Sequence, residues 1–345
     1  MSSDISIRIE GHAGRITLTR PQALNALSYK MCLAIDAALI DWAKDERVKL
    51  LIIDAEGTRA FCAGGDIAEM YETGRAGDFG YGRKFWADEY RMNARLFNFP
   101  KPVVSLMQGY TMGGGVGLGC HGSHRIVCEN SEMAMPEVGI GLIPDVGGTL
   151  VLSRAPGRLG EYLGATARRM PAGDAIYAGF ADYFIAQSKW PDLIARLCDT
   201  GDWEEVDRAA TAPMPSDLES IQDKIDHFFG GETLRDILNG LASDDSDFAV
   251  DTIKTLARNS PLAMAATIEL IHRVRVRDTI EYALEQEYRF TSRAVEKADF
   301  LEGVRAQIID KDRNPNWMHS SPRDVPPAMV ASLLLPSGPR ALKLD

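Results

Sequence analysis

The chain has 345 residues, of which 45% are hydrophobic and 25% are charged, a balance typical of a soluble globular enzyme with one large domain or two. The net charge of −11 argues against nucleic acid as the main partner, because phosphate backbones are bound by clustered Lys and Arg. No run approaches the length of a membrane span, so we expect no membrane partner.

The N-terminal segment, MSSDISIRIEG, has neither the charge and apolar pattern of a signal peptide nor the Arg-rich character of a transit peptide. The five cysteines form no CxxC pair, which argues against a disulfide framework and favours reduced thiols. We therefore expect the protein in the cytoplasm.

The first elements alternate between strand and helix. Residues 5–19 alternate apolar and polar side chains around a turn at residues 12–14, which predicts a hairpin. Ser28 is a candidate N-cap for a helix running to Lys44, and residues 50–53 form a short apolar run typical of a buried strand. This order predicts an α/β domain.

Residues 60–70, AFCAGGDIAEM, pass from a strand through a glycine turn into a helix. Asp66 lies near the first turn of that helix, where capping is the favoured interpretation over catalysis. Residues 74–82 are predicted to form a mobile loop, and the following helix, residues 84–97, carries Asp88, Glu89 and Arg91 on what we expect to be a solvated face.

Two glycine-dense turns follow a predicted buried strand at residues 103–107: TMGGGVGLG at 111–119 and MPEVGIGLIPDVGG at 135–148. The second turn holds Glu137 and Asp145 among apolar residues, where a carboxylate is costly to bury unless it is paired or used. Beyond residue 156 the strand signals fade, helices are predicted near 218–229 and 279–294, and the tail after residue 320 is expected to be loosely ordered.

Four chemistries fit these residues to different degrees. A GxGxxG match at residues 117–122 lies too far from its strand for dinucleotide binding, and the Cys and His residues at 120–128 match no zinc spacing, so no metal is expected. No GxSxG elbow is present, and Cys62 is interpreted as a packing residue. The fourth chemistry is best supported: two glycine turns offer backbone N–H groups to a carbonyl oxygen while Glu137 or Asp145 acts nearby. The alternative is that the glycines only allow close packing.

At these residues the sequence resembles the crotonase (enoyl-CoA hydratase/isomerase) superfamily, through AFCAGGDI, GYTMGGGVGL and MPEVGIGLIPDVGGT. It is most similar to the 3-hydroxyisobutyryl-CoA hydrolases, which it also resembles at residues 286–289 and 299–317. The resemblance implies an α/β fold with a crotonase-type ββα superhelical core at residues 1–200 and a helical C-terminal region at 201–345 that completes the same enzyme.

The hydratases of this superfamily use two glutamates. Here Gly117 stands at the first of these positions, whereas Glu137 retains the second. Since hydration needs an acid and a base around the added water, this loss argues against a hydratase. Asp145 stands where hydratases usually have glycine, as in the hydrolase branch.

The resemblance also implies roles for individual residues. The amides of Gly65 and Gly114 would form the oxyanion hole, Glu137 would be the main catalytic carboxylate, and Asp145 would orient or protonate beside it. Glu89 would contact the acyl hydroxyl or the water.

Arg20 and Asp66 are further candidates for substrate binding, since the adenine of coenzyme A is expected near residues 20–27 and 60–67. Coenzyme A is part of the substrate, so no separate cofactor is expected, and a homo-oligomer is possible. The implied activity is hydrolysis of 3-hydroxyisobutyryl-CoA or a similar short acyl-CoA in valine catabolism. The alternatives are an enoyl-CoA hydratase or isomerase, an NAD-dependent oxidoreductase and a non-catalytic CoA-binding protein.

Overall fold

The structure of the protein is a computed structural model that describes residues 4–344, so the first three residues of the N-terminal segment lie outside it. The chain forms two compact units that interleave along the sequence. The sheet unit comprises the residues up to 66 together with 91–134 and 169–219, and the helical unit comprises 67–90, 135–168 and the residues from 220 onward. These units do not follow the boundary at residue 200, and the predicted division of the enzyme there stays a prediction.

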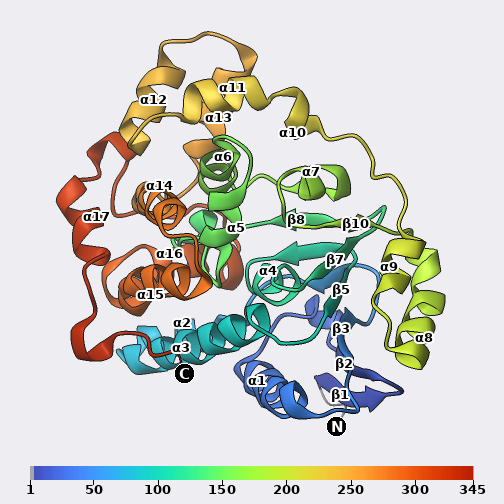
Figure 1. The fold of residues 1–345 in the computed structure, drawn as a ribbon. Helices are drawn as coiled ribbons and strands as arrows, with labels where there is room; N and C mark the ends of the chain where they lie inside the picture. Colours follow the sequence, from blue (N-terminus) through green and yellow to red (C-terminus); the bar gives the residue numbers. More distant parts are fainter. Residues whose placement is uncertain (1–3, 345) are drawn as a thin grey trace. The chain divides into compact units, whose positions relative to one another are not determined.

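The larger sheet of the sheet unit has the strand order β1-β2-β3-β5-β7-β10 (Figure 1). Only β1 and β2 pair antiparallel, and the other neighbours are parallel. The predicted hairpin is confirmed, but its turn falls at residues 11–12, where Gly11 has a φ of +58°. The strands are β1 Ile5–Glu10, β2 Ala13–Leu18, β3 Leu50–Ala55, β5 Val103–Met107, β7 His124–Val127 and β10 Tyr183–Phe184.

A second sheet has the order β4-β6-β8-β9. Its strands are β4 Ala60–Cys62, β6 Tyr110–Met112, β8 Glu132–Ala134 and β9 Met170–Pro171. Three successive pairs of strands divide between the two sheets. The first strand of each pair (β3, β5 or β7) belongs to the large sheet, and the second (β4, β6 or β8) belongs to the small sheet. Helices α2 Ala68–Arg75 and α3 Phe79–Phe97 follow the first pair and α4 Gly114–Gly119 follows the second, so the repeating element is a ββα unit, as expected.

The large sheet is buried by helices of its own unit. Helix α1, Tyr29–Lys44, begins after Ser28, whose side chain accepts a hydrogen bond from the Met31 amide, so the predicted cap is confirmed. Leu50 and Ile52 of β3 pack in a core cluster with Trp190 and other residues of α8 Trp190–Thr200. The unit also contains η1 Pro21–Ala23, α7 Ala172–Tyr177, η3 Gln187–Lys189 and α9 Glu204–Ala209.

The helical unit is built around α14, Pro261–Val276, which packs against α5 Gly148–Arg154, α6 Leu159–Thr166 and α15 Ile280–Lys297 (Figure 1). Both predicted C-terminal helices are present, the first as α10 Asp217–Ser220 and α11 Gln222–Phe229 and the second as α15. The remaining elements are η2 Glu137–Ile140, α12 Leu234–Ala242, α13 Asp247–Leu256, α16 Phe300–Val304, the π-helix η4 Arg305–Ile309, η5 Pro322–Asp324, α17 Pro327–Leu333 and η6 Gly338–Arg340.

Three local predictions are wrong. The expected loop at 74–82 is mostly helix, because α2 continues to Arg75 and α3 begins at Phe79. The tail after residue 320 is ordered, since prolines at the first turns of η5 and α17 favour helix starts. Asp66 is not a cap, because the residue preceding α2 is Ile67, which makes no side-chain cap.

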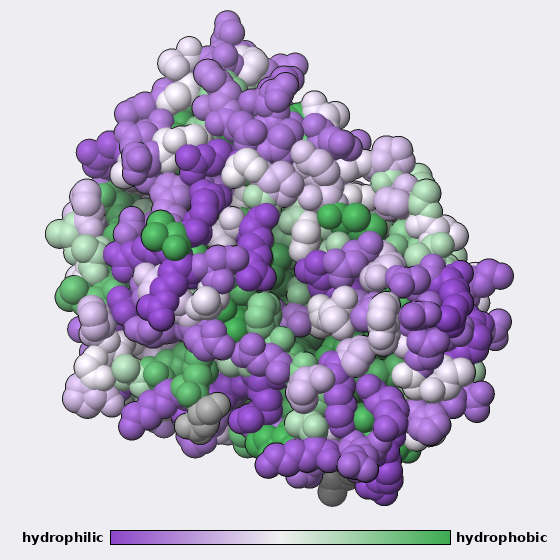
Figure 2. Space-filling view, in the orientation of Figure 1, coloured by the Kyte–Doolittle hydropathy of each residue, from purple (hydrophilic) through white to green (hydrophobic). Residues whose placement is uncertain are grey.

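Among residues 4–344, no helix combines the length and the apolar character needed to cross a bilayer. The face of the molecule in Figure 2 is mostly hydrophilic, and its hydrophobic residues lie in groups among hydrophilic ones.

Candidate active site

Two neighbouring strands of the small sheet end at the glycine turns. β4 and β6 are parallel, with Cys62 opposite Thr111, so the turns that follow them leave the same edge of the sheet. A side chain at Gly115 is excluded, because a Cβ there would lie 2.1 Å from the Cys62 carbonyl oxygen. Gly64 has a φ of +117° and Gly113 one of +51°, so both turns need glycine conformations. The glycines therefore bring two backbone turns into contact.

The amides of Gly65 and Gly114 are left without a backbone acceptor among residues 4–344. Gly65 pairs with Leu27 in a parallel bridge, in which the Leu27 amide donates to the Gly64 carbonyl and the Asp66 amide donates to the Leu27 carbonyl. This pairing uses the Gly64 carbonyl and the Asp66 amide, on either side of Gly65, and does not use the Gly65 amide. Gly114 is the first residue of α4, where N–H groups have no partner within the helix. Both residues have the free donor that an oxyanion hole requires.

Arg20 and Asp66, the two candidates for substrate binding, contact each other. Arg20 Nη2 lies 3.1 Å from Asp66 Oδ2, and Arg20 Nη1 donates to the Ala26 carbonyl at 2.9 Å. Arg20 thus ties the segment that contains Leu27 to the turn that contains Gly65. Their role toward a substrate stays a prediction.

Four of the buried carboxyl side chains of the helical unit are Glu89 of α3, Glu137 of η2, Asp145 before α5 and Glu287 of α15. Their exposed fractions are 4%, 5%, 5% and 0%. Within residues 4–344 none of the four forms an ion pair with Lys, Arg or His, whereas buried carboxylates are ordinarily paired. The prediction that Glu89 lies on a solvated face is wrong, because this residue of α3 points inward while Asp88 pairs with Lys84.

Burial without a cation raises the pKa of these groups. Desolvation, followed by the charge of Asp145, raises the pKa of Glu89 to about 8 and that of Glu137 well above its usual range. Desolvation raises the pKa of Asp145 to about 7, although a hydrogen bond from Tyr90 opposes the change. At neutral pH the cluster therefore retains protons that ordinary surface carboxyls would have lost.

The hydrogen bonds within this cluster are unequal. Tyr90 Oη donates to Asp145 Oδ2 at 2.7 Å, and Glu287 accepts hydrogen bonds from the amides of Gly147 and Thr149. In contrast, Glu137 Oε2 is buried without a hydrogen-bond partner in the described part of the chain. A buried, unpartnered carboxyl oxygen is costly, so Glu137 is the group whose setting most favours a chemical role.

The sequence did not identify Tyr90 and Glu287 as site residues. Glu287 lies in the QEYR stretch that contributed to the family resemblance, and Tyr90 directly follows Glu89. Those positions were the only signal, because the contacts join α15 and α3 to a turn far away in sequence.

Two alternatives from the sequence, a cysteine nucleophile and a metal site, involve Cys62 and the Cys and His residues at 120–128. Cys62, Cys120 and Cys128 are buried, and burial raises the pKa of the Cys120 thiol to about 12, so it is an inert packing residue. Within the described residues no three His, Cys, Asp or Glu side chains are arranged to hold a metal ion. The expectation of a metal-free enzyme stays a prediction.

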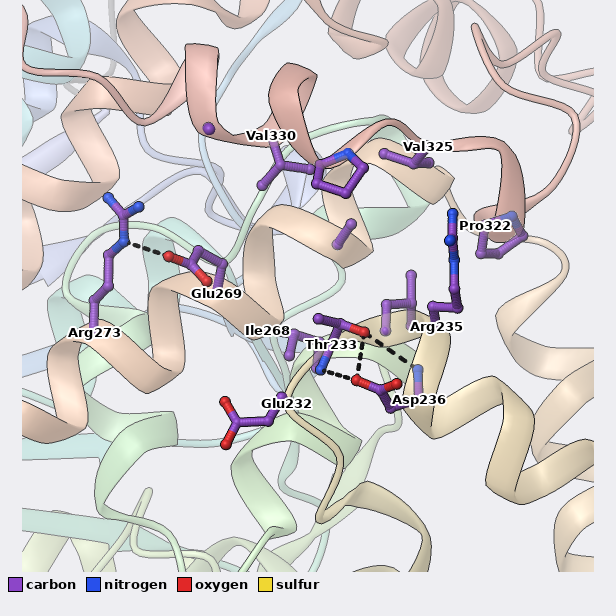
Figure 3. A pocket seen from close by; sticks show the side chains of 14 residues that line it. Glu232, Thr233, Arg235, Asp236, Ile268, Glu269, Arg273, Pro322, Val325 and Val330 are labelled. Carbon is purple, nitrogen blue, oxygen red and sulfur yellow. Dashed lines mark hydrogen bonds and ion pairs between the residues drawn. The ribbon is translucent and has the colours of Figure 1, made fainter.

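A separate pocket of about 390 Å³ lies in the helical unit among α12, α14 and α17 (Figure 3). Four of its polar residues already pair with one another: Arg273 Nε lies 2.7 Å from Glu269 Oε1, and Thr233 forms a reciprocal capping box with Asp236. None of the predicted site residues line it.

Comparison with known proteins identifies the family. The Enoyl-CoA hydratase/isomerase family model matches residues 13–334. The chain belongs to this family. It is 38% identical to 3-hydroxyisobutyryl-CoA hydrolase, mitochondrial, of Rattus norvegicus and 34% identical to the Gallus gallus protein of that name, each over 99% of this chain and 91% of the relative.

A solved structure described as an enoyl-CoA hydratase from Rhodobacter sphaeroides 2.4.1 is 56% identical to the chain, with a TM-score of 0.94 over 99% of this chain and 100% of the other. The predicted crotonase-type α/β core with a helical C-terminal region is therefore confirmed. The relatives named above include hydrolases and a structure described as a hydratase, so the reaction of this chain has to be argued from its residues.

Proposed function

We propose that the protein is a thioester hydrolase that converts 3-hydroxyisobutyryl-CoA, or a similar short acyl-CoA, to the free acid and coenzyme A. The names of the curated relatives support this substrate and, with it, a role in valine catabolism. The observation that carries the proposal is the buried pair of Glu137 and Asp145 in a chain that has Gly117 where hydratases have a glutamate.

A hydratase has to protonate one carbon and deliver hydroxide to the next, and it uses two carboxyl groups around one water. Gly117 lies within α4 and supplies no carboxyl; its carbonyl accepts a hydrogen bond from Asn93 Nδ2 at 3.1 Å. Asp145, which accepts a hydrogen bond from Tyr90, supplies a carboxyl group at a different position in the chain. This exchange favours hydrolysis over hydration, despite the description of the Rhodobacter structure.

The residues support a two-stage reaction. The amides of Gly65 and Gly114 stabilise the negative charge that develops on the thioester oxygen when a nucleophile adds to the carbonyl carbon. The nucleophile is either the Glu137 carboxylate, which gives an anhydride that water opens, or a water from which Glu137 removes a proton. In both routes the carbon–sulfur bond breaks, and the departing thiolate takes a proton, for which protonated Asp145 is the candidate donor.

Further parts of the proposal concern recognition. Glu89 contacts the acyl hydroxyl or the attacking water, and Arg20 and Asp66 border the coenzyme A site. Coenzyme A enters as part of the substrate, with no separate cofactor. A homo-oligomer and a cytoplasmic location stay predictions; the curated relatives are named as mitochondrial proteins.

The decisive experiment offers the protein two substrates. Release of coenzyme A from 3-hydroxyisobutyryl-CoA is followed with a thiol-reactive dye, and hydration of crotonyl-CoA is followed by loss of its conjugated double bond. We expect thiol release only from the first substrate and a loss of at least roughly a hundredfold in the Glu137→Gln variant. Hydration of crotonyl-CoA without thiol release would instead make the protein a hydratase, and binding of both without turnover would make it a CoA-binding protein.

A further inference from the structure

The turn that carries Asp145 has a demanding backbone. Val146 has a φ of +54° and Gly147 one of +79°, immediately before α5 begins at Gly148. A β-branched residue is unfavourable in the left-handed region, so surrounding contacts have to hold the turn in place. The orientation of the Asp145 side chain depends on that support.

Glu287 supplies the support from α15. Its Oε2 accepts the Gly147 amide at 2.8 Å, and its Oε1 accepts the Thr149 amide at 3.0 Å and also the Thr149 hydroxyl. All three donors are buried and belong to the segment that directly follows Asp145. Glu287 is fully buried, pairs with no cation in the described part of the chain and holds three donors of one turn, which is the geometry of a brace.

Tyr90 supplies a second contact, made directly to the Asp145 carboxylate. Tyr90 Oη lies 2.7 Å from Asp145 Oδ2 and 3.3 Å from Thr291 Oγ1, and the Tyr90 ring packs edge-on against Tyr288. Thr291 lies one helical turn beyond Glu287 on α15, so one face of this helix supports both contacts. A phenol that donates to a carboxylate favours its ionised form.

We propose that Glu287 and Tyr90 are positioning residues for Asp145: Glu287 holds the turn that presents it, and Tyr90 fixes the orientation of its carboxyl group. This inference rests on the proposed hydrolase function, in which Asp145 acts beside Glu137. Neither positioning residue touches the reacting atoms in this scheme. Their effects must therefore pass through Asp145, which makes them separable from a general loss of stability.

The first test uses Tyr90→Phe, which retains the ring and removes only the phenol. We expect kcat for thiol release to fall roughly tenfold with KM within about twofold, as for one lost hydrogen bond, and the falling limb of the pH–rate profile, which reports loss of the Asp145 proton, to move to higher pH. In the Asp145→Asn background the same change should have little further effect on kcat. Tyr162→Phe is the matched control, because Tyr162 is a buried tyrosine of the same unit whose hydroxyl bonds to Arg168 instead.

The second test uses Thr149, which contacts Glu287 through its hydroxyl. Thr149→Ser retains that donor and Thr149→Val removes it at nearly constant shape, so we expect near wild-type kcat in the first variant and a loss of roughly tenfold in the second. Equal activities of the two variants would overturn the role of Glu287. The role of Tyr90 would be overturned by a Tyr90→Phe effect of full size in the Asp145→Asn background. An unmoved pH profile in Tyr90→Phe would overturn it as well.

A third measurement does not depend on turnover. Hydrogen exchange of the segment at 145–152, followed by mass spectrometry, should be faster in Glu287→Gln, because the amide group of Gln presents a donor to a backbone N–H. Unchanged exchange would overturn the brace. If the wild-type protein releases no coenzyme A from any short acyl-CoA, the proposed function fails while this measurement still decides the structural inference.

Discussion

Glu161 and Arg275 form a doubly hydrogen-bonded ion pair in the helical unit, with Arg275 Nη1 2.6 Å from Glu161 Oε1 and Nη2 2.9 Å from Oε2. The Glu161 side chain is fully buried and also contacts His272 and Arg158. This arrangement is what a structural buried acid requires. The same unit leaves Glu89, Glu137 and Asp145 without any cation among the described residues, and this contrast with Glu161 favours a chemical role for them.

Replacing Glu161 should therefore destabilise the protein. Burial alone raises the pKa of Glu161, but hydrogen bonds from His272 and Arg275 outweigh it and lower the pKa from 4.5 to about 2. The contribution is present above pH 4.5 and is lost as the pH falls toward 2. We expect Glu161→Gln to reduce the free energy of unfolding by about 3 kcal/mol at pH 7, measured by denaturant titration.

The matched control for this change is Asp251→Asn, which breaks the exposed pair between Asp251 and Lys254. We expect an effect below about 1 kcal/mol, as for most surface ion pairs. Equal losses in the two variants would contradict a special role for the buried pair, and so would a Glu161→Gln deficit that persisted undiminished at pH 2.5.

Replacing Glu89, in contrast, should stabilise the protein at alkaline pH. Its pKa is raised from 4.5 to about 8, so its contribution to stability is complete below pH 4.5 and is lost as the pH rises through 8. Glu89→Gln avoids the cost of a buried charge. We expect the Tm of this variant to exceed that of wild type by roughly 4 °C or more at pH 9 and by much less at pH 5, in differential scanning fluorimetry.

Asp88→Asn, one residue away on the same helix, controls for the Glu89 change because Asp88 pairs with Lys84, which is largely exposed. Its Tm difference from wild type should not grow at alkaline pH. Since Glu89 is proposed to bind substrate, a more stable Glu89→Gln variant should also hydrolyse 3-hydroxyisobutyryl-CoA more slowly, the usual conflict between stability and function. An unchanged Tm at pH 9 would mean that Glu89 is not charged there.

The pH dependence of hydrolysis should report the coupling between Asp145 and Glu137. After desolvation, the charge of Asp145 is the main cause of the raised pKa of Glu137. Activity that needs ionised Glu137 rises with pH, and removal of the neighbouring charge in Asp145→Asn should move that rising limb to lower pH by roughly one unit. The measurement is kcat/KM for thiol release between pH 5 and 9.5, and a limb that stays in place would exclude the coupling.

Local patterns in the sequence predicted much of this fold. The Ser28 cap, the hairpin and the strand-to-glycine turns each depend on a few adjacent residues, and all three are present. Asp66 was misassigned because its true partner, Arg20, is 46 residues away in the sequence. The contacts that support Asp145 could not be predicted for the same reason. Glu287 lies 140 residues from Gly147 in the sequence, and only the packing of α15 brings it to this turn.

The glycine turns offer the most direct test of the proposed oxyanion hole. A Cβ on Gly115 would lie 2.1 Å from the Cys62 carbonyl oxygen, and this contact is with backbone that cannot rotate away. Gly115→Ala must therefore push the turn after β4 and the turn after β6 apart, which displaces the amides of Gly65 and Gly114. We expect thiol release from 3-hydroxyisobutyryl-CoA to fall by roughly a hundredfold or more, as when an oxyanion donor is removed.

The matched control for Gly115→Ala is Gly240→Ala, in the interior of α12, where the nearest atom to a new Cβ is Phe228 Cδ1 at 3.9 Å. That change should leave kcat unaltered and raise stability by up to about 1 kcal/mol through helix propensity. A folded Gly115→Ala protein with wild-type kcat would show that the two turns tolerate separation. The glycines would then serve packing alone, and the thioester oxygen would have to be stabilised elsewhere in the chain.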